Sequence, residues 1–262
     1  MELDLYQIDT FTDKIFGGNP ACVVPLEDWL SDDTLLNISR ENAVPETAFF
    51  TAKDGVIHLR WFTPEIEMDL CGHATLAVAH CLQSIIGYPA KRMLFETKSG
   101  SLIVTEDNGI YTLDLPSRLP TLSSLPNVIS MALNIQPIEV LKSRDYVLVY
   151  ESEKDIENIE VNKQVFDQIN LDPGGVVVTA MGDNCDFVSR YFTPQASILE
   201  DPVTGSAHCS LVPFWSSRFG KDELSAIQLS TRGGALKCIN RGNRVMISGK
   251  AKTYSVGRLW TE

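Results

Sequence analysis

The chain has 262 residues, of which 44% are hydrophobic and 21% are charged, a composition typical of globular proteins rather than disordered or fibrous ones. Its 34 acidic and 22 basic side chains give a formal net charge of −12, which opposes binding to nucleic acid and to anionic lipid. Because no apolar run approaches the roughly 20 residues of a membrane-spanning helix, we expect a soluble protein without a membrane partner.

The six cysteines contain no C-x-x-C pair, so their spacing indicates neither a zinc knuckle nor a disulfide framework. The first residues are acidic where a signal peptide would carry basic ones. These two features predict reduced thiols and a cytoplasmic location.

Short β-branched and aromatic segments predict strands, and longer segments with apolar residues at helical spacing predict helices. In chain order the pattern predicts a helix over 31–41, strands over 46–51 and 56–62, a helix over 72–86, strands over 102–105 and 110–115, a helix over 161–169, a strand over 176–180, a helix over 205–219 and a strand over 244–248. Pro213 is expected to kink or shorten the helix that contains it. The proline-rich stretch 116–126 predicts a link between two domains, 1–118 and 119–262.

The chain repeats part of its own sequence. The sequence RWFTP at 60–64 returns as RYFTP at 190–194, and the small-residue turn at 72–74 returns at 205–207. Upstream, 50–52 aligns with 178–180, an offset of 128 residues. The repeat predicts a duplication that produces two structurally similar halves.

Each small-residue turn lies where a loop is predicted to become a helix. Backbone N–H groups at a helix N-terminus bind anions, so Gly72, His73 and Ala74 in one half, and Gly205 and Ser206 in the other, are candidates to bind a carboxylate. The alternative is that the glycines and the serine only cap two buried helices. The positive end of the helix is expected to keep His73 neutral, as suits a hydrogen-bond donor.

Glu46 lies at the start of an apolar strand, where its carboxyl group could carry a proton to and from a substrate. At an offset of 128 its counterpart is Gly174, so the two halves differ chemically. A racemase with two thiol bases is a rival hypothesis, because the helix start is expected to lower the pKa of Cys71. However, the repeat partner of Cys71 is Thr204, and Cys209 is displaced from that position. The pattern therefore favours one base rather than two.

Two further kinds of site are disfavoured by spacing. The four histidines show no H-x-x-x-H or H-E-x-x-H pattern, so we expect no metal site. Asp201, Ser206 and His208 are close in sequence, but the G-x-S-x-G turn of many serine hydrolases is missing. Asp201 could accept hydrogen bonds from a substrate amine or from turn amides, and an Asp-Pro turn is also common without any function.

Taken in order along the chain, these motifs resemble the phenazine-biosynthesis (PhzF) family. The motifs are GNPA at 18–21, ETAF at 46–49, RWFTP at 60–64, CGHAT at 71–75 and EDPVTGSA at 200–207. The resemblance implies an α+β fold of the diaminopimelate epimerase type, with two pseudo-symmetric halves that are each a curled, mostly antiparallel sheet around a central helix. It also implies a homodimer that needs no cofactor.

In the enzyme that gives this family its name, the glutamate of the ETAF motif moves a proton during isomerisation of trans-2,3-dihydro-3-hydroxyanthranilate. The resemblance carries that role to Glu46, and substrate binding or orientation to His73, Asp201 and Ser206. We therefore expect a cofactor-independent isomerase that acts on a small carboxylated, amino- or hydroxy-substituted metabolite. A metabolite-binding protein without turnover and a thiol racemase remain the alternatives.

Overall fold

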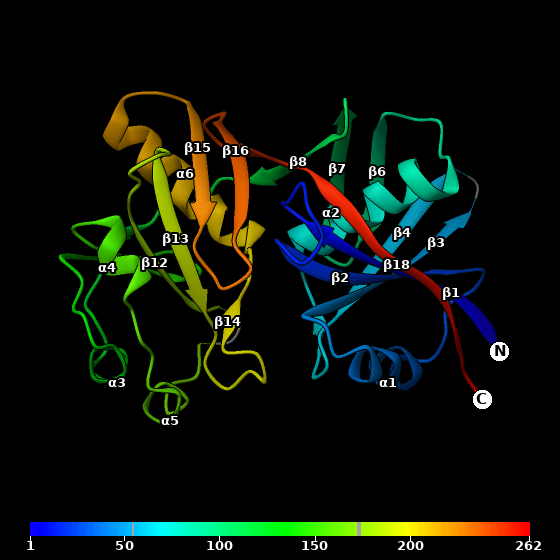
Figure 1. Ribbon diagram of the computed structural model, residues 1–262, viewed down its shortest axis with the longest axis horizontal. Coiled ribbons are helices and arrows are strands. Elements are labelled where there is room, and N and C mark those ends of the chain that lie inside the picture. The colour runs from blue at the N-terminus through cyan, green and yellow to red at the C-terminus, as the bar shows by residue number, and fades with distance from the viewer. Residues whose placement is uncertain (54, 172–173) are drawn as a thin grey trace. The chain divides into compact units, whose positions relative to one another are not determined.

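The structure is a computed structural model that describes residues 1–53, 55–171 and 174–262. The chain forms two compact units, Met1–Asp114 with Ser248–Glu262, and Leu115–Ile247 (Figure 1). In the described residues, no helix is long and apolar enough to cross a membrane. Strands make up most of the regular structure in both units, as predicted.

The first unit is a mostly antiparallel sheet with a buried helix. Its strands are β1 (Glu2–Thr10), β2 (Asn19–Leu26), β3 (Glu46–Lys53), β4 (Val56–Phe62), β5 (Glu67–Met68), β6 (Arg92–Thr97), β7 (Gly100–Asp107), β8 (Ile110–Pro116) and β18 (Ala251–Trp260). Its helices are α1 (Asp32–Asn42), α2 (Gly72–His80) and the π-helix η1 (Cys81–Ile86), which continues α2. All residues of α2 are buried, and α2 packs against β1, β2, β3 and β18, so it is the central helix that the sheet surrounds.

The second unit has the same kind of architecture. Its strands are β9 (Thr121–Leu122), β10 (Glu139–Lys142), β11 (Tyr146–Val149), β12 (Val176–Met181), β13 (Phe187–Phe192), β14 (Glu200–Asp201), β15 (Glu223–Gln228), β16 (Gly234–Asn240) and β17 (Arg244–Gly249). Its helices are α3 (Asn127–Ala132), α4 (Glu153–Glu157), α5 (Lys163–Phe166) and α6 (Gly205–Phe219). Helix α6 continues through Pro213 to Phe219, with Gly220 as its C-cap, so the proline does not shorten it.

Strand pairing confirms the duplication that the repeated motifs predict. In the first unit β2 pairs parallel with β3, β3 antiparallel with β4, β4 antiparallel with β5 and parallel with β6, and β6 antiparallel with β7. In the second unit β11, β12, β13, β14, β15 and β16 repeat this series of pairings in the same order and directions. The predicted α+β fold with two similar halves is therefore confirmed.

The repeated arginines explain why the RWFTP and RYFTP motifs resemble each other. Arg60 Nε lies 2.7 Å from Glu67 Oε1, and Arg190 Nε lies 2.7 Å from Glu200 Oε1. Each guanidinium also lies 5.0 Å from the centre of a phenylalanine ring two residues later in its own strand. In both units the arginine–glutamate ion pair joins the strand that carries the arginine to the short strand that follows it, β4 to β5 and β13 to β14.

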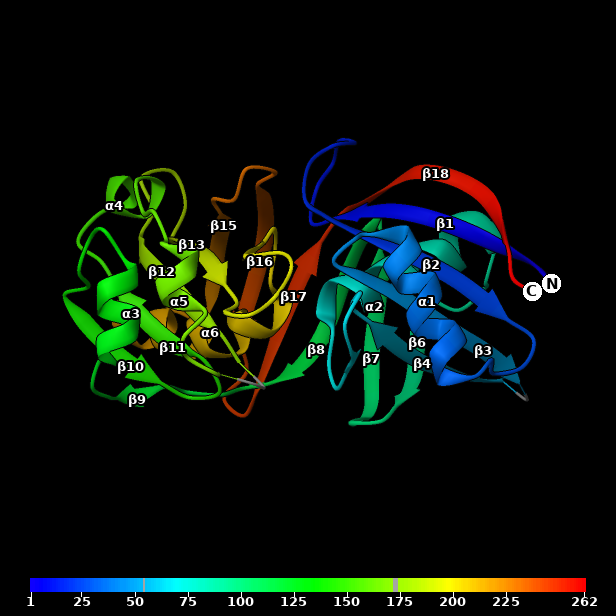
Figure 2. The same cartoon turned by 90° about the horizontal axis from the view of Figure 1, so that it is seen from below.

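Strand β18 returns to the first unit from the far end of the chain. It pairs antiparallel with β1 from Glu2–Trp260 to Thr10–Ala251. Figures 1 and 2 both show the two strands side by side and the chain ends next to each other. The expected link over 116–126 lies at the start of the second unit, and the residue pattern carries no signal for the return of 248–262 to the first.

The strand register corrects the expected counterpart of Glu46. Thr47 pairs with Phe62, and Val176 pairs with Phe192. Phe62 and Phe192 are equivalent positions of the repeated motif, so their partners Thr47 and Val176 are equivalent too. The residue before each partner is Glu46 in the first unit and Gly175, not Gly174, in the second. The offset of 128 was wrong by one residue because it was taken from short motifs whose side chains do not define the pairing.

Gly175 leaves no room for a side chain at this position of the second unit. A Cβ atom there would lie 2.7 Å from both Cζ and Oη of Tyr191. The Tyr191 hydroxyl donates a hydrogen bond to Oδ1 of buried Asp145 at 2.9 Å, and Gly175 N–H donates to the same oxygen at 3.0 Å. The place that a carboxylate has in the first unit is thus filled by a tyrosine in the second.

We expect Gly175→Ala to lower the free energy of unfolding by about 1–3 kcal/mol, because the new methyl group overlaps the Tyr191 ring. Urea denaturation followed by circular dichroism measures the change. Gly257→Ala is the matched control, since a Cβ at Gly257 meets nothing within 4 Å. Equal stability of the two variants would contradict the close packing at Gly175.

His208 gives the second unit a dependence on pH. Its side chain is fully buried, Nδ1 donates to the Thr204 carbonyl at 2.9 Å, and burial lowers its pKa to about 4. As the pH falls, His208 is therefore protonated at a lower pH in the folded state than in the unfolded state, where the pKa of a histidine is about 6.5. The contribution of neutral His208 to the free energy of unfolding is fully present above the unfolded-state pKa. It is lost as the pH drops from about 6.5 toward 4.

Between about pH 7 and pH 5, His208 is expected to account for a loss on the order of 2 kcal/mol in the free energy of unfolding. We predict that His208→Gln removes this part of the pH dependence. Unfolding by urea at both pH values measures it. The control is His58→Gln at an exposed position, which should keep the wild-type difference between the two pH values. An unchanged pH dependence in His208→Gln would show that this histidine is not the buried neutral group.

Candidate functional site

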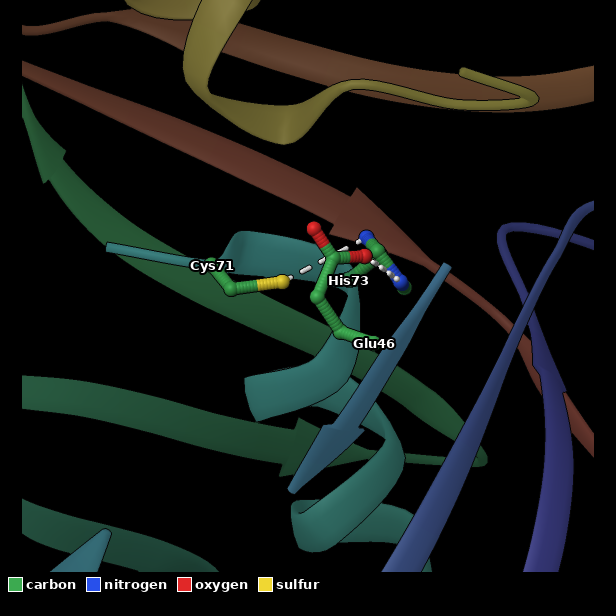
Figure 3. A group of neighbouring side chains, drawn as sticks. All are labelled: Glu46, Cys71 and His73. Carbon is green, nitrogen blue, oxygen red and sulfur yellow. Dashed lines mark hydrogen bonds and ion pairs between the residues drawn. The ribbon is translucent and has the colours of Figure 1, made fainter. Parts of the chain in front are cut away.

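The starts of a strand and a helix bring together Glu46, Cys71 and His73 in the first unit (Figure 3). Glu46 is the first residue of β3, Cys71 is the N-cap of α2, and His73 lies in its first turn. His73 Nε2 is 3.2 Å from Glu46 Oε2, and His73 Nδ1 is 3.5 Å from Cys71 Sγ. The imidazole thus has a carboxylate beside one nitrogen and a thiol beside the other.

Burial distinguishes these three side chains from ordinary surface groups. His73 and Cys71 are 3% and 5% exposed, whereas the Glu46 side chain is 14% exposed. Glu46 Oε2 and His73 Nε2 are both buried and form an ion pair with each other at 3.2 Å. Glu46 therefore has a buried partner, while a small part of its own side chain stays exposed.

Asn19 holds His73 from the side opposite Glu46. It is the first residue of β2, fully buried, with its amide Nδ2 3.1 Å from His73 Nδ1. Gly18 makes this approach possible, because its φ is +62° and a Cβ there would lie 1.9 Å from the Thr10 carbonyl oxygen. Sequence reasoning noticed Asn19 only within the GNPA motif and did not assign it to the site; the adjoining glycine was the only local signal.

The pKa of His73 is opposite to the expectation of a neutral ring. Burial disfavours the charged imidazolium, but the adjacent Cys71 and Glu46 outweigh it and raise the pKa well above its usual range. The Glu46 carboxylate is the cause that remains at neutral pH. The helix start is therefore a weaker influence on this histidine than the carboxylate in contact with it.

The expectation that the helix start lowers the pKa of Cys71 is wrong. Burial, followed by the negative charge of Glu46, raises the pKa of Cys71 to about 11. The expected lowering by the helix N-terminus is overcome because the thiol is out of contact with water. At neutral pH Cys71 is therefore a protonated thiol and not a base.

Helix α2 begins without a side-chain cap. Its N-cap residue, Cys71, accepts no hydrogen bond from the first turn through its side chain, and the same holds for Thr204 before α6. Gly72, His73 and Ala74 form the first turn of α2 and are buried. The N-cap positions are thus occupied by Cys71 and Thr204, and the glycines and the serine lie within the first turns of the two helices.

The remaining predicted residues lie around the start of α6 in the second unit. Gly205 begins the helix, and Ser206, in its first turn, is half-buried. Asp201 ends β14 and accepts a hydrogen bond from the Thr204 hydroxyl. His208 directs Nδ1 to the helix backbone instead of to Asp201. The structure therefore groups the predicted residues by unit, Glu46 with His73 and Asp201 with Ser206.

The fold also assembles a set of possible metal ligands that spacing did not indicate. One ligand atom each from Glu46, Cys71 and His73 lies within 4.8 Å of the others. Short-motif spacing could not show this set, because Glu46 lies 25 residues before Cys71, in a strand that is separate from helix α2.

We expect Glu46→Gln to lower the pKa of His73, because it removes the carboxylate charge that favours the imidazolium. Titration of the His73 ring followed by heteronuclear NMR measures this downward shift of the pKa. Glu41→Gln, an exposed acid at the end of α1, is the control and should leave the His73 titration unchanged. Identical titrations in wild type and Glu46→Gln would contradict the electrostatic contact.

Comparisons with known proteins agree with this architecture. An "Uncharacterized isomerase" of Pseudomonas aeruginosa is 46% identical over 260 residues, with 99% of both chains covered. The crystal structure of a phenazine biosynthesis protein of the PhzF family from Enterococcus faecalis has a TM-score of 0.94 at 41% identity, with 100% of both chains covered.

A more distant structure extends the likeness of fold. A probable proline racemase from Agrobacterium radiobacter has a TM-score of 0.66 at 10% identity, covering 99% of this chain and 93% of its own. The family model described as "Phenazine biosynthesis-like protein" matches residues 8–257. With nearly its whole length matched by the model and by close relatives, the chain belongs to the phenazine biosynthesis-like (PhzC-PhzF) family.

Proposed function

We propose that this protein is a cofactor-independent isomerase that moves a proton between two carbons of a small carboxylated metabolite, with Glu46 as the acid/base. The observation that carries the proposal is the contact of Glu46 with buried His73, 3.2 Å away. Support also comes from relatives that are themselves named isomerases. Amino- or hydroxy-substituted acids are the proposed substrates.

The reaction needs a group that both accepts and returns a proton. In the proposed step the Glu46 carboxylate takes the proton from a substrate carbon, and the electron pair of that C–H bond moves into the unsaturated substrate. The protonated Glu46 then gives the proton to a second carbon, which restores the carboxylate. His73 orients the carboxyl group through the contact between its Nε2 and Glu46 Oε2.

Backbone N–H groups are the proposed binding site for the substrate's carboxylate. The first turn of α2 presents the backbone N–H groups of Gly72, His73 and Ala74 at the positive end of the helix. His73, which contacts Glu46, is one of these three residues. Asp201, Gly205 and Ser206 at the start of α6 are assigned to substrate binding by the family resemblance. A homodimer remains a prediction on the same basis.

Several features favour one acid/base over two. The counterpart of Glu46 in the second unit is Gly175, where a Cβ would overlap Tyr191. Burial raises the pKa of Cys71 and of Cys209 to about 11 each, so both are thiols at neutral pH. A racemase with two thiol bases would need at least one of them as a thiolate. These features support a shift of the proton between carbons rather than inversion at one carbon.

We expect Glu46→Gln to abolish solvent deuterium incorporation into a substrate, with a loss of at least about 100-fold, because an amide cannot carry the proton. Small carboxylated amino- and hydroxy-acids are first screened for thermal stabilisation, and proton-exchange NMR then measures incorporation. Glu41→Gln is the matched carboxylate-to-amide control and should retain the wild-type rate.

Three results would contradict the proposal. Undiminished exchange in Glu46→Gln would remove this residue from the chemistry. Loss of exchange in Cys71→Ser together with Cys209→Ser, but not in Glu46→Gln, would favour the thiol racemase. Thermal stabilisation by a compound that neither wild type nor Glu46→Gln turns over would favour a binding protein without catalysis.

A further inference from the structure

A surface hollow in the first unit is separate from the group at the start of α2. Residues of β4, β5 and β6 line it, together with the segment that leads into α1 and the first residue of that helix. Its volume is about 660 Å³, within the range of sites that bind small molecules. The lining residues used below are Trp29, Asp32, Arg60, Glu67, Glu96 and Lys98.

Strand register places this hollow and the proposed acid/base on opposite faces of the sheet. Thr47 pairs with Phe62, and Phe49 pairs with Arg60. Side chains alternate between the two faces along a strand, and directly opposite residues of neighbouring strands share a face. Arg60 therefore lies on the face of Thr47 and Phe49, which α1 covers, whereas Glu46 lies on the other face.

The guanidinium of Arg60 has one nitrogen that the fold does not use. Its Nε and Nη2 donate to carboxylates of β5 and α1, whereas Nη1 makes no hydrogen bond to any residue that the structure describes. In the second unit, Nη1 of the equivalent Arg190 donates to the backbone carbonyls of Ile156 and Ile159, at 3.1 and 2.8 Å. The repeated arginine thus has its own carbonyl acceptors in the second unit, and in the first it can donate to an oxygen of a ligand.

Trp29 gives the hollow an aromatic wall. Its side chain is 39% exposed, and the guanidinium carbon of Arg60 lies 5.4 Å from the centre of its ring. The cation holds one part of the indole in place, while the exposed part offers a flat apolar surface. An aromatic ring packed on this surface would bury apolar area with a favourable ring geometry.

The charges of the hollow favour a ligand that carries both signs. Three carboxylates and two cations line it, so a simple anion would meet a net negative charge. Two of the carboxylates, those of Asp32 and Glu67, already pair with Arg60. Lys98 is exposed, 3.6 Å from a Glu67 oxygen, and Glu96 accepts hydrogen bonds from a serine hydroxyl. A zwitterion can pair its carboxylate with Lys98 and its ammonium group with Glu96.

We infer that this hollow binds a free aromatic amino acid. The ligand's carboxylate accepts a hydrogen bond from Nη1 of Arg60 and pairs with Lys98. Its ammonium group pairs with Glu96, and its ring packs on Trp29. This binding does not depend on the function proposed for Glu46, because the two groups lie on opposite faces of the sheet.

The test follows the indole N–H signal of Trp29 by NMR in the full-length protein, with Trp29→Phe to assign the signal. We expect L-phenylalanine to shift this signal saturably, with a dissociation constant below about 10 mM. The signal of Trp260, an exposed indole of β18, should stay in place. Phenylacetate lacks the ammonium group and phenethylamine lacks the carboxylate, so each should bind at least about tenfold more weakly.

Variants that remove one charge assign each end of the ligand to its partner. Glu96→Gln should weaken the binding of L-phenylalanine about threefold or more without weakening that of phenylacetate. Lys98→Gln should weaken the binding of both compounds. Lys91→Gln changes an exposed lysine just before β6 and is the matched control, which should bind as wild type does. Circular dichroism checks the fold of each variant.

A Trp29 signal that L-phenylalanine leaves unmoved, or that all three compounds move equally, would overturn the inference. Equal affinities in wild type, Glu96→Gln and Lys98→Gln would overturn it as well. Glu46→Gln should retain the full shift of the Trp29 signal, and its loss there would contradict a site independent of Glu46. Failure of the proposed function is recognised separately, by deuterium exchange that persists in Glu46→Gln.

Discussion

The contact between Glu46 and His73 is the constraint around which the first unit is organised. A histidine that is 3% exposed needs partners for both ring nitrogens, and these come from the starts of two strands, β2 and β3. The parallel pairing of β2 with β3 brings Asn19 and Glu46 to the same end of two neighbouring strands. Buried helix α2 then places His73 between them, so the chemistry of the site follows from where three elements begin.

The two units share a topology but not a chemistry. Both keep an arginine–glutamate contact with a phenylalanine beneath the guanidinium, which indicates that the duplicated part retains its framework. At the position of Glu46, however, the second unit has Gly175, with the Tyr191 hydroxyl bonded to Asp145 in the vacated space. At this position the first unit carries an ionisable carboxyl group, whereas the second unit has a glycine packed against a tyrosine.

Much of the fold was readable from the sequence because its signals are local. Repeated short motifs revealed the duplication, and the order of five motifs indicated the family. Features that depend on packing were not readable. The Asn19–His73 contact joins residues 54 apart, and the pairing of β1 with β18 joins the chain ends. The state of the Cys71 thiol was misjudged because helix position is visible in sequence, whereas complete burial beside a carboxylate is not.

The return of β18 to β1 has a consequence for the order in which the protein folds during synthesis. The second unit, Leu115–Ile247, is a continuous segment that lies wholly between the two segments of the first. It can form its strand pairings within one uninterrupted stretch of chain, and domains generally fold as units as the chain emerges. The unit with Glu46 must wait, because β1 meets β18 only after residues 251–260 have been made. The half proposed to be catalytic is therefore the last to close.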